Sequence, residues 1–152
     1  MTAFQNEAVI RWLTHPPEGM PRMTVGSGAM TPALPVEFNP GAAHPLATSP
    51  GELLAGAIGT TFAWFAAHEL LQAGHQAHEL IAEVTVSAAT DDGDIANLTL
   101  SAISCTLRGR VPAIDQGQLE AVSKAAIERC VECFRLRPDG LRVHADATLE
   151  GH

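Results

Sequence analysis

Residues 49–74 constrain the fold more than any other segment, because they read as one long helix without a polar face. Ser49 suits the N-cap, Glu52 completes a capping box three residues later, and Gly74 is typical just beyond a helix end. From residue 53 to residue 67 the side chains are apolar or small on every side, which is typical of a helix buried all round. We therefore expect a central helix wrapped by β-sheet, part of it from a second subunit.

In the rest of the chain, the spacing of apolar and polar residues predicts several strands and one further helix, so the expected class is α+β. The second helix should begin at Asp115 as N-cap, with Gln118 at its third position. The alternation of the second long strand changes phase, which predicts a β-bulge near Ala102. The expected strands are residues 8–13, 22–30 and 33–39 as a small antiparallel meander, residues 79–90 and 95–111 as a long hairpin, and residues 141–149. We expect a single domain over residues 1–149, because residues 150–152 read like the start of a purification tag.

The net charge and the cysteine content limit which partners and which cellular compartment are expected. The chain has a formal net charge of −8 and no basic cluster, so neither nucleic acid nor an anionic membrane is expected as a partner. The central helix is too short, and too interrupted by Gly59, Thr60 and Thr61, to span a bilayer. Three cysteines do not suit a disulfide scaffold, and the N-terminus lacks a secretory signal, so we expect a cytoplasmic protein.

Four motifs in sequence order resemble the OsmC/Ohr family of hydroperoxide-stress proteins. They are "IRW" in the first strand, "SPGELLAGAIGTTF" at the central helix, "VPAID" before the second helix, and "AAIERCVECFRL" within it. The resemblance covers nearly the whole chain. It implies an intertwined homodimer in which antiparallel sheets from both subunits wrap the buried helices, with two active sites at the interface.

The resemblance also implies a thiol-based reduction of organic hydroperoxides, in which a peroxidatic cysteine lies in the middle of the central helix. An Arg and a Glu hold it as a thiolate, since the thiolate is the nucleophile. A resolving cysteine near the end of the second helix then forms a disulfide, and an external dithiol reduces it. No cofactor and no metal is implied.

This sequence departs from that pattern at each catalytic position. The peroxidatic position is Thr61, which offers no thiolate. The position of the family's Glu is Gly51, whereas the neighbouring Glu52 is explained by the capping box. No Arg occurs in the loop before the helix, which leaves Arg22 as a weak substitute. Only the resolving position keeps its residue, as Cys130.

Cys130 and Cys133 allow three interpretations. At positions i and i+3 of one helix they are spaced for a redox pair, with Arg129 and other nearby arginines offsetting the unfavourable helix dipole. They also match half of a metal site, although no second C-x-x-C exists. The interpretation we favour is structural: the two cysteines are small apolar residues of a packing stripe. That predicted stripe consists of Leu119, Val122, Ala126, Cys130 and Cys133.

Around Thr61 the sequence suggests an apolar pocket. Phe62, Trp64 and Phe65 lie one turn or less from it, either in the core or lining the old active site. A catalytic threonine needs a base, and His44 is the one candidate in the preceding loop. The simpler interpretation makes Thr60 and Thr61 core threonines that bond a carbonyl one turn back.

Other candidate residues have simpler structural interpretations. A buried, inert Cys105 is expected on the second long strand. Solvated histidines at the end of the central helix are expected, with a surface zinc site as the alternative; these are His68, His75 and His78. The "DDGD" stretch, residues 91–94, is expected to be a hairpin turn and not a calcium loop.

Two functional hypotheses follow. In the first, the protein is an OsmC-like stress-associated protein that has lost standard peroxidase chemistry and binds a small lipophilic molecule beside Thr61. In the alternative, it is a thiol-dependent organic hydroperoxide reductase, in which Cys130 attacks the peroxide, Cys133 resolves the intermediate, and an external dithiol recycles the pair. The loss of both the Cys and the Glu equivalents favours the first hypothesis slightly.

Overall fold

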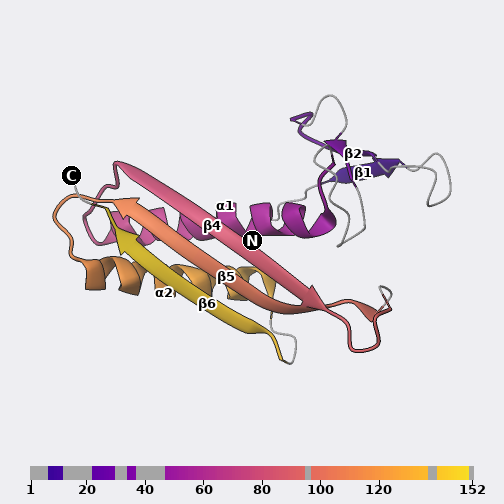
Figure 1. Cartoon of the computed structure of the whole chain (residues 1–152). Coiled ribbons are helices and arrows are strands. Elements are labelled where there is room, and N and C mark those ends of the chain that lie inside the picture. The colour runs from indigo at the N-terminus through magenta and orange to yellow at the C-terminus, as the bar shows by residue number, and fades with distance from the viewer. Residues whose placement is uncertain are drawn as a thin grey trace. The chain divides into compact units, whose positions relative to one another are not determined.

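The computed structural model describes residues 7–11, 22–29, 34–36, 47–94, 97–136 and 140–150 (Figure 1). It separates into two compact units, residues 1–53 and 54–152. The expected single domain stays a prediction. The elements are β1 (Ala8–Arg11), β2 (Arg22–Val25), β3 (Leu34–Pro35), α1 (Pro50–Gln72), β4 (Glu79–Ala89), β5 (Thr99–Arg110), α2 (Gln116–Phe134) and β6 (Arg142–Leu149).

The amino-terminal unit contains the predicted antiparallel meander, with the strand order β1-β2-β3. Strand β2 is shorter than the expected residues 22–30, because it ends at a turn in which Gly28 has a φ of 73°. Only a residue without a side chain adopts that backbone easily. Residues 12–13, 33 and 37–39 of the other two predicted strands lie outside the described residues. Val36 and Thr48 form a parallel bridge, which brings the chain to the start of α1.

Both helices begin as the sequence predicts. At α1 the Glu52 amide donates to Ser49 Oγ over 3.1 Å, while the Ser49 amide donates to Glu52 Oε2 over 2.7 Å. At α2 the same reciprocal pair forms between Asp115 and Gln118, with both bonds at 2.8 Å. These capping boxes satisfy backbone N–H groups that have no partner inside the helix. Gly74, with a φ of 83°, follows the end of α1.

The carboxy-terminal unit contains a sheet with the strand order β4-β5-β6. The long hairpin β4–β5 is antiparallel, and its register shifts between Ser87 and Ala88, opposite Ala102 and Leu100. The bulge predicted near Ala102 is therefore confirmed. The sheet is mixed and not wholly antiparallel, because β6 runs parallel to β5. The intervening helix α2 returns the chain to the starting end of β5, as a parallel connection requires.

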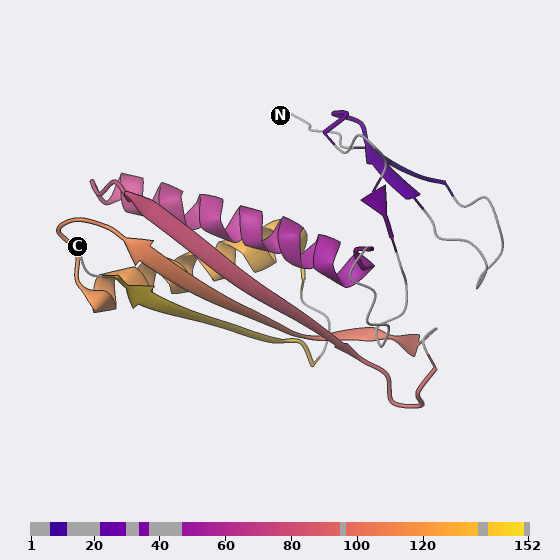
Figure 2. The same cartoon turned by 45° about the horizontal axis from the view of Figure 1, so that its top comes forward.

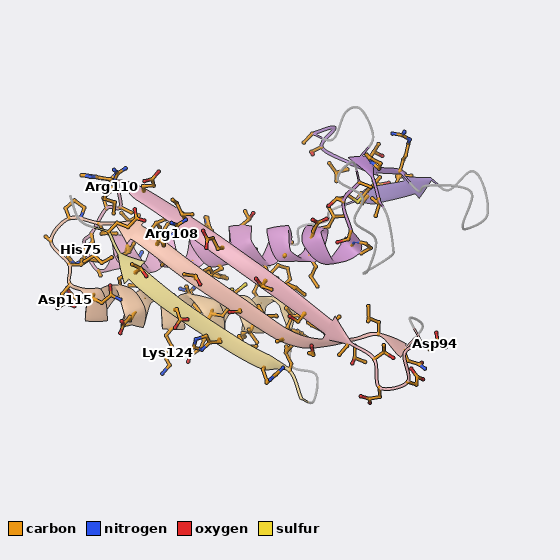
Figure 3. The ribbon with its side chains drawn as sticks, in the orientation of Figure 1. His75, Asp94, Arg108, Arg110, Asp115 and Lys124 are labelled. Atoms are coloured by element: carbon orange, nitrogen blue, oxygen red, sulfur yellow. The ribbon has the colours of Figure 1, made fainter. Side chains whose placement is uncertain are left out.

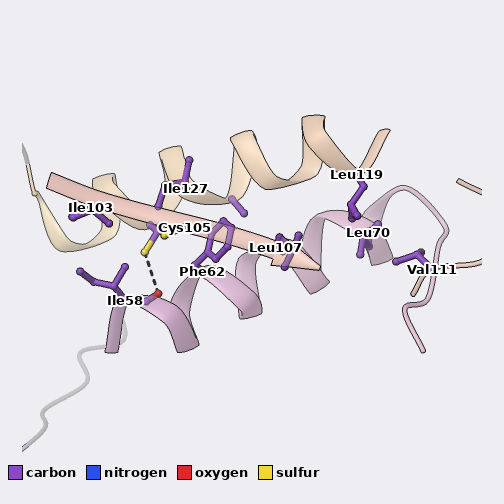
Figure 4. Close-up of a cluster of buried hydrophobic side chains, with 12 residues drawn as sticks. Ile58, Phe62, Leu70, Ile103, Cys105, Leu107, Val111, Leu119 and Ile127 are labelled. Atoms are coloured by element: carbon purple, nitrogen blue, oxygen red, sulfur yellow. Dashed lines mark hydrogen bonds between the residues drawn. The ribbon is translucent and has the colours of Figure 1, made fainter. Parts of the chain in front are cut away.

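Both helices lie on one face of this sheet, and the core fills the space between them (Figure 2). Alternate residues of β5 face the helices, and Phe62 of α1 lies among them without exposed surface. Gly59 allows a close approach, since a Cβ there would lie 3.1 Å from Val84 Cγ2. Figure 4 shows the cluster, which includes Ile58, Phe62, Leu70, Ile103, Leu107 and Leu119.

The opposite face of the sheet is polar. Arg108 pairs with Glu83 over 2.6 Å and Arg110 pairs with Glu79 over 2.9 Å, so two ion pairs link β4 and β5 there (Figure 3). The Glu150 amide donates to Gly109 O over 2.9 Å, which ties the chain after β6 to the sheet. Residues 151–152 of the predicted tag remnant lie outside the described residues. Among the described helices, none has the length and hydropathy that crossing a membrane requires.

Helix α1 is buried on one face within the single chain. Its buried residues recur every fourth position, at Ile58, Phe62, Ala66 and Leu70. On another face Trp64 is 61% exposed and Leu71 is 63% exposed. The expectation of burial on every side therefore holds only for the face that contacts the sheet. An all-apolar helix half covered in this way leaves an apolar surface for a partner or a ligand.

Candidate functional site

Thr61 lies in the middle of α1, half-buried, one turn after Ile58 and one turn before Phe65. Its neighbour Thr60 is exposed, and the Thr60 hydroxyl donates to the Gly56 carbonyl over 2.9 Å. This is the predicted bond to the previous turn, although Thr60 is not a core residue.

An aromatic cluster, formed by Trp64, Phe65 and His68, lies one to two turns beyond Thr61. The ring centroids of Trp64 and Phe65 are 5.2 Å apart with the planes inclined at 64°, an edge-to-face contact. The Trp64 and His68 rings are stacked, with centroids 5.7 Å apart and planes 11° from parallel. Phe62 does not belong to this cluster, because it lies in the core under the sheet.

Arg129 of α2 reaches the aromatic cluster from the second helix. Its guanidinium carbon lies 4.9 Å from the centroid of the Phe65 ring, and it also forms an ion pair with Glu69. A guanidinium over an aromatic face is attracted by the ring quadrupole. The sequence alone indicates Arg129 only as a neighbour of the cysteines, because its contact with Glu69 joins residues 60 positions apart.

Cys130 lies against the backbone of α1, at the turn before Thr61. Its Sγ donates to the Ile58 carbonyl at 3.7 Å, and the residue is fully buried. Burial, and secondly the charge of Cys133, raise the pKa of the Cys130 thiol to about 11. The thiol is therefore almost entirely protonated at pH 7. A thiol of that kind is a poor nucleophile.

Cys133 is exposed and is not part of the buried face of α2. The buried residues of α2 are Leu119, Ser123, Ala126, Ile127 and Cys130. The predicted stripe is therefore right for Cys130 and wrong for Cys133. Both thiols are free, and one points into the core while the other faces solvent. Cys105 is buried, and burial, followed by the charge of Cys130, raises its pKa to about 12.

The other predicted site residues are not shown around Thr61. Glu52 belongs to the capping box, where bonds from the Ser49 amide and the Thr48 hydroxyl lower its pKa. Gly51 lies beside Glu52 in the first turn of α1 and is exposed. Arg22 lies on β2, in the amino-terminal unit. His44 lies outside the described residues.

Metal binding has no support among the residues that the structure describes, where no three His, Cys, Asp or Glu side chains cluster suitably. In the hairpin turn the Asp92 carboxylate accepts hydrogen bonds from within the turn itself. The donors are the Thr90 hydroxyl at 2.7 Å, the backbone N–H of Asp94 at 2.9 Å and the side-chain amide of Asn97 at 2.6 Å. These bonds, led by that of Thr90, lower the Asp92 pKa to about 2.

Two hollows in the described chain lie away from Thr61. One, of about 540 Å³, lies between α2 and β6 and is lined partly by Lys124, His144 and Asp146. The other, of about 610 Å³, lies beyond the end of α1 and is lined by residues that include His75 and His78. Figure 3 labels Lys124 beside the first and His75 at the second. Neither contains a residue predicted at the peroxidatic site.

The three thiols should differ sharply in reactivity. With iodoacetamide at pH 7 and without denaturant, we expect rapid alkylation of Cys133 alone, because Cys105 and Cys130 are buried with raised pKa values. Intact mass should show one adduct in the native protein and three in guanidinium chloride. Cys133→Ser should abolish the native adduct, and fast native labelling of Cys130 would contradict the structure.

The comparisons with known proteins agree on one family. A family model described as OsmC-like protein matches residues 42–138. Among solved structures, 37 chains match. No curated protein matches this sequence.

Three solved structures resemble the chain closely in fold. The organic hydroperoxide resistance protein OhrB of Bacillus subtilis has a TM-score of 0.72 and 18% identity, over 95% of this chain and 98% of its own. An OsmC-like protein of Mycoplasma pneumoniae has a TM-score of 0.71 and 14% identity, over 99% of both chains. The organic hydroperoxide resistance protein OsmC of Legionella pneumophila has a TM-score of 0.70 and 15% identity, over 97% of this chain and 99% of its own. At such identities the likeness establishes the fold.

Proposed function

Because this chain belongs to the family of OsmC-like proteins, we propose that it is a stress-associated member whose site beside Thr61 binds a small apolar organic molecule. In this proposal it does not reduce hydroperoxides by the thiol chemistry of the family. The single observation that carries the proposal is the chemistry at position 61. A threonine hydroxyl stands there in place of a thiol. The thiol of Cys130, which contacts the Ile58 carbonyl one turn earlier on α1, is buried, and burial raises its pKa to about 11.

The aromatic cluster supports the binding part of the proposal. Trp64 is 61% exposed although it contacts both Phe65 and His68, so a large apolar surface faces outward one turn from Thr61. Binding sites for small molecules are built mainly from apolar and aromatic side chains with few polar groups. Thr61 supplies one such polar group.

We also propose that the protein is a cytoplasmic homodimer. The exposed residue Leu71 lies on a helix that is apolar throughout its middle, and a second copy would cover it. Three cysteines without disulfides suit a reducing compartment. In the dimer the Thr61 site would lie close to the partner subunit.

The alternative function, a thiol-dependent hydroperoxide reductase using Cys130 and Cys133, has less support from the geometry. Cys130 would have to leave the core before it met a peroxide, since its Sγ contacts the Ile58 carbonyl. Cys133 is exposed and could react first, but its partner would still be a buried thiol. A reductase of this kind would also need an external dithiol.

The decisive experiment combines a peroxidase assay with a binding assay. Reduced protein with cumene hydroperoxide and dithiothreitol should consume no more peroxide than dithiothreitol alone, and its intact mass should not change. Nile red, a neutral apolar dye, should gain fluorescence with the protein, and Trp64→Ala should weaken that gain.

Matched variants make the outcome specific. Phe134→Ala removes another exposed aromatic ring, at the end of α2, and should leave the Nile red signal unchanged. Peroxide consumption that either Cys130→Ser or Cys133→Ser abolishes would establish the alternative function instead. The absence of dye binding would overturn the binding proposal.

A further inference from the structure

We propose that the free edge of β6 binds an extended, cationic peptide by strand addition. This edge lies beside the hollow of about 540 Å³ between α2 and β6, within the carboxy-terminal unit. The proposal goes beyond the function proposed for Thr61 and does not depend on it, because none of the residues that line this hollow belongs to that site.

The open edge of β6 is the first argument. In the sheet order β4-β5-β6 the strand β6 lies at the margin, and β5 is the one strand that pairs with it in the described part of the chain (Figure 1). The Glu150 N–H donates to Gly109 O of β5, whereas the Leu149 N–H is bonded on the other side of the strand. Because this direction alternates along a strand, Val143 and Ala145 present their N–H and C=O groups to the free side, as Leu149 does. Such an edge is a template for another extended chain.

Gln116, the first residue of α2, shows which chemistry this edge accepts. Its Nε2 donates to the Ala147 carbonyl and its Oε1 accepts from the Leu149 N–H, both over 2.8 Å. One amide group thus bonds the residues on either side of position 148, as a residue of a parallel strand would. Glu120 holds this amide, since it accepts a further bond of 2.8 Å from Nε2. An amide therefore takes the place of a neighbouring strand at one end of the edge, and the remainder, towards Val143, suits peptide groups.

The side chains around the hollow indicate the class of peptide. Ile127 and Val131 of α2 line it together with Val143, which is 37% exposed, so part of the lining is apolar. The charged part consists of three carboxylates and one ammonium group, and this excess of negative charge favours a cationic partner. The charged residues are Glu120, Glu128, Asp146 and Lys124, and His144 contacts Asp146.

The alternation of side chains in a strand defines the sequence of such a peptide. Apolar residues should face α2, and the basic residues between them should face the outer side of the sheet. Pairing of β6 with β6 of a second copy would instead bring two sets of the same carboxylates together, which disfavours that occupant.

Nuclear magnetic resonance of isotope-labelled protein tests strand addition directly. The probe is the pentapeptide acetyl-Lys-Val-Lys-Val-Lys-amide. It should shift the backbone amide signals of Val143 and Ala145 and slow their hydrogen exchange. The same peptide N-methylated at its three central residues lacks the donors for strand pairing, so it should bind at least about tenfold more weakly. A peptide with glutamate in place of every lysine should be weakened to at least the same extent.

Two glutamates one turn apart on α2 give matched variants. Glu128 lines the hollow and Glu132 does not, although both are exposed. Glu128→Gln should weaken binding of the lysine peptide roughly twofold to fivefold, as the loss of an exposed charge pair does, and Glu132→Gln should leave it unchanged. Equal affinity for the N-methylated peptide would overturn strand addition. An Ala145 amide already protected in the free protein, together with no peptide binding, would mean that a second copy covers the edge, and would overturn the proposal as well.

Discussion

Replacing Phe62 by alanine should lower the free energy of unfolding by roughly 3–5 kcal/mol. Phe62 has no exposed surface and packs within the cluster that includes Ile58, Ile103 and Leu107. Truncation loses the free energy gained by burying the ring. It also leaves a cavity, because the closely packed sheet and helices relax only partly to fill the space. Urea unfolding followed by circular dichroism measures the change, and a loss this large is a sizeable part of the stability of a typical domain.

A matched phenylalanine gives the control. Phe134 at the end of α2 is 39% exposed, so Phe134→Ala should cost less than about 1 kcal/mol. Equal losses for the two variants would contradict the placement of Phe62 in the core. Trp64→Ala should behave differently from Phe62→Ala, because it should reduce Nile red binding with little loss of stability. This contrast separates the core from the proposed binding surface at Trp64, which the sequence alone could not do.

Local signals predicted most of the fold. The capping boxes at Ser49 and Asp115 could be predicted because their hydrogen bonds join residues three apart. The bulge near Ala102 could be predicted because strand alternation has a period of two, so a change of phase requires an extra residue. The order of strands and helices followed from the same kind of local pattern.

Features that depend on tertiary contact could not be predicted in this way. The parallel pairing of β6 with β5 depends on where α2 returns the chain. The exposure of Cys133 depends on which face of α2 meets the sheet. Arg129 reaches Phe65 and Glu69 only through the relative position of two helices, and no spacing within either helix indicates it. The candidate site on α1 stays a prediction, and nothing in the sequence indicated that Arg129 contacts this helix.

Leu71→Glu should convert the protein from a dimer to a monomer. Leu71 is 63% exposed in the single chain, on the surface that the second copy is proposed to cover. A carboxylate buried there without a partner should weaken association by roughly a hundredfold or more, since an unpaired buried charge costs several kcal/mol. Light scattering after size-exclusion chromatography should give twice the 16.0 kDa chain mass for the wild type and 16.0 kDa for the variant.

The control for this variant adds the same charge to a surface that stays in solvent. Thr85→Glu, on the exposed polar face of β4, should remain a dimer. A wild-type mass of 16.0 kDa would overturn the dimer proposal and leave Leu71 open to a different partner. If Leu71→Glu dissociates the dimer and also loses Nile red binding, the partner subunit completes the Thr61 site. If the monomer still binds the dye, the aromatic cluster of one chain is sufficient.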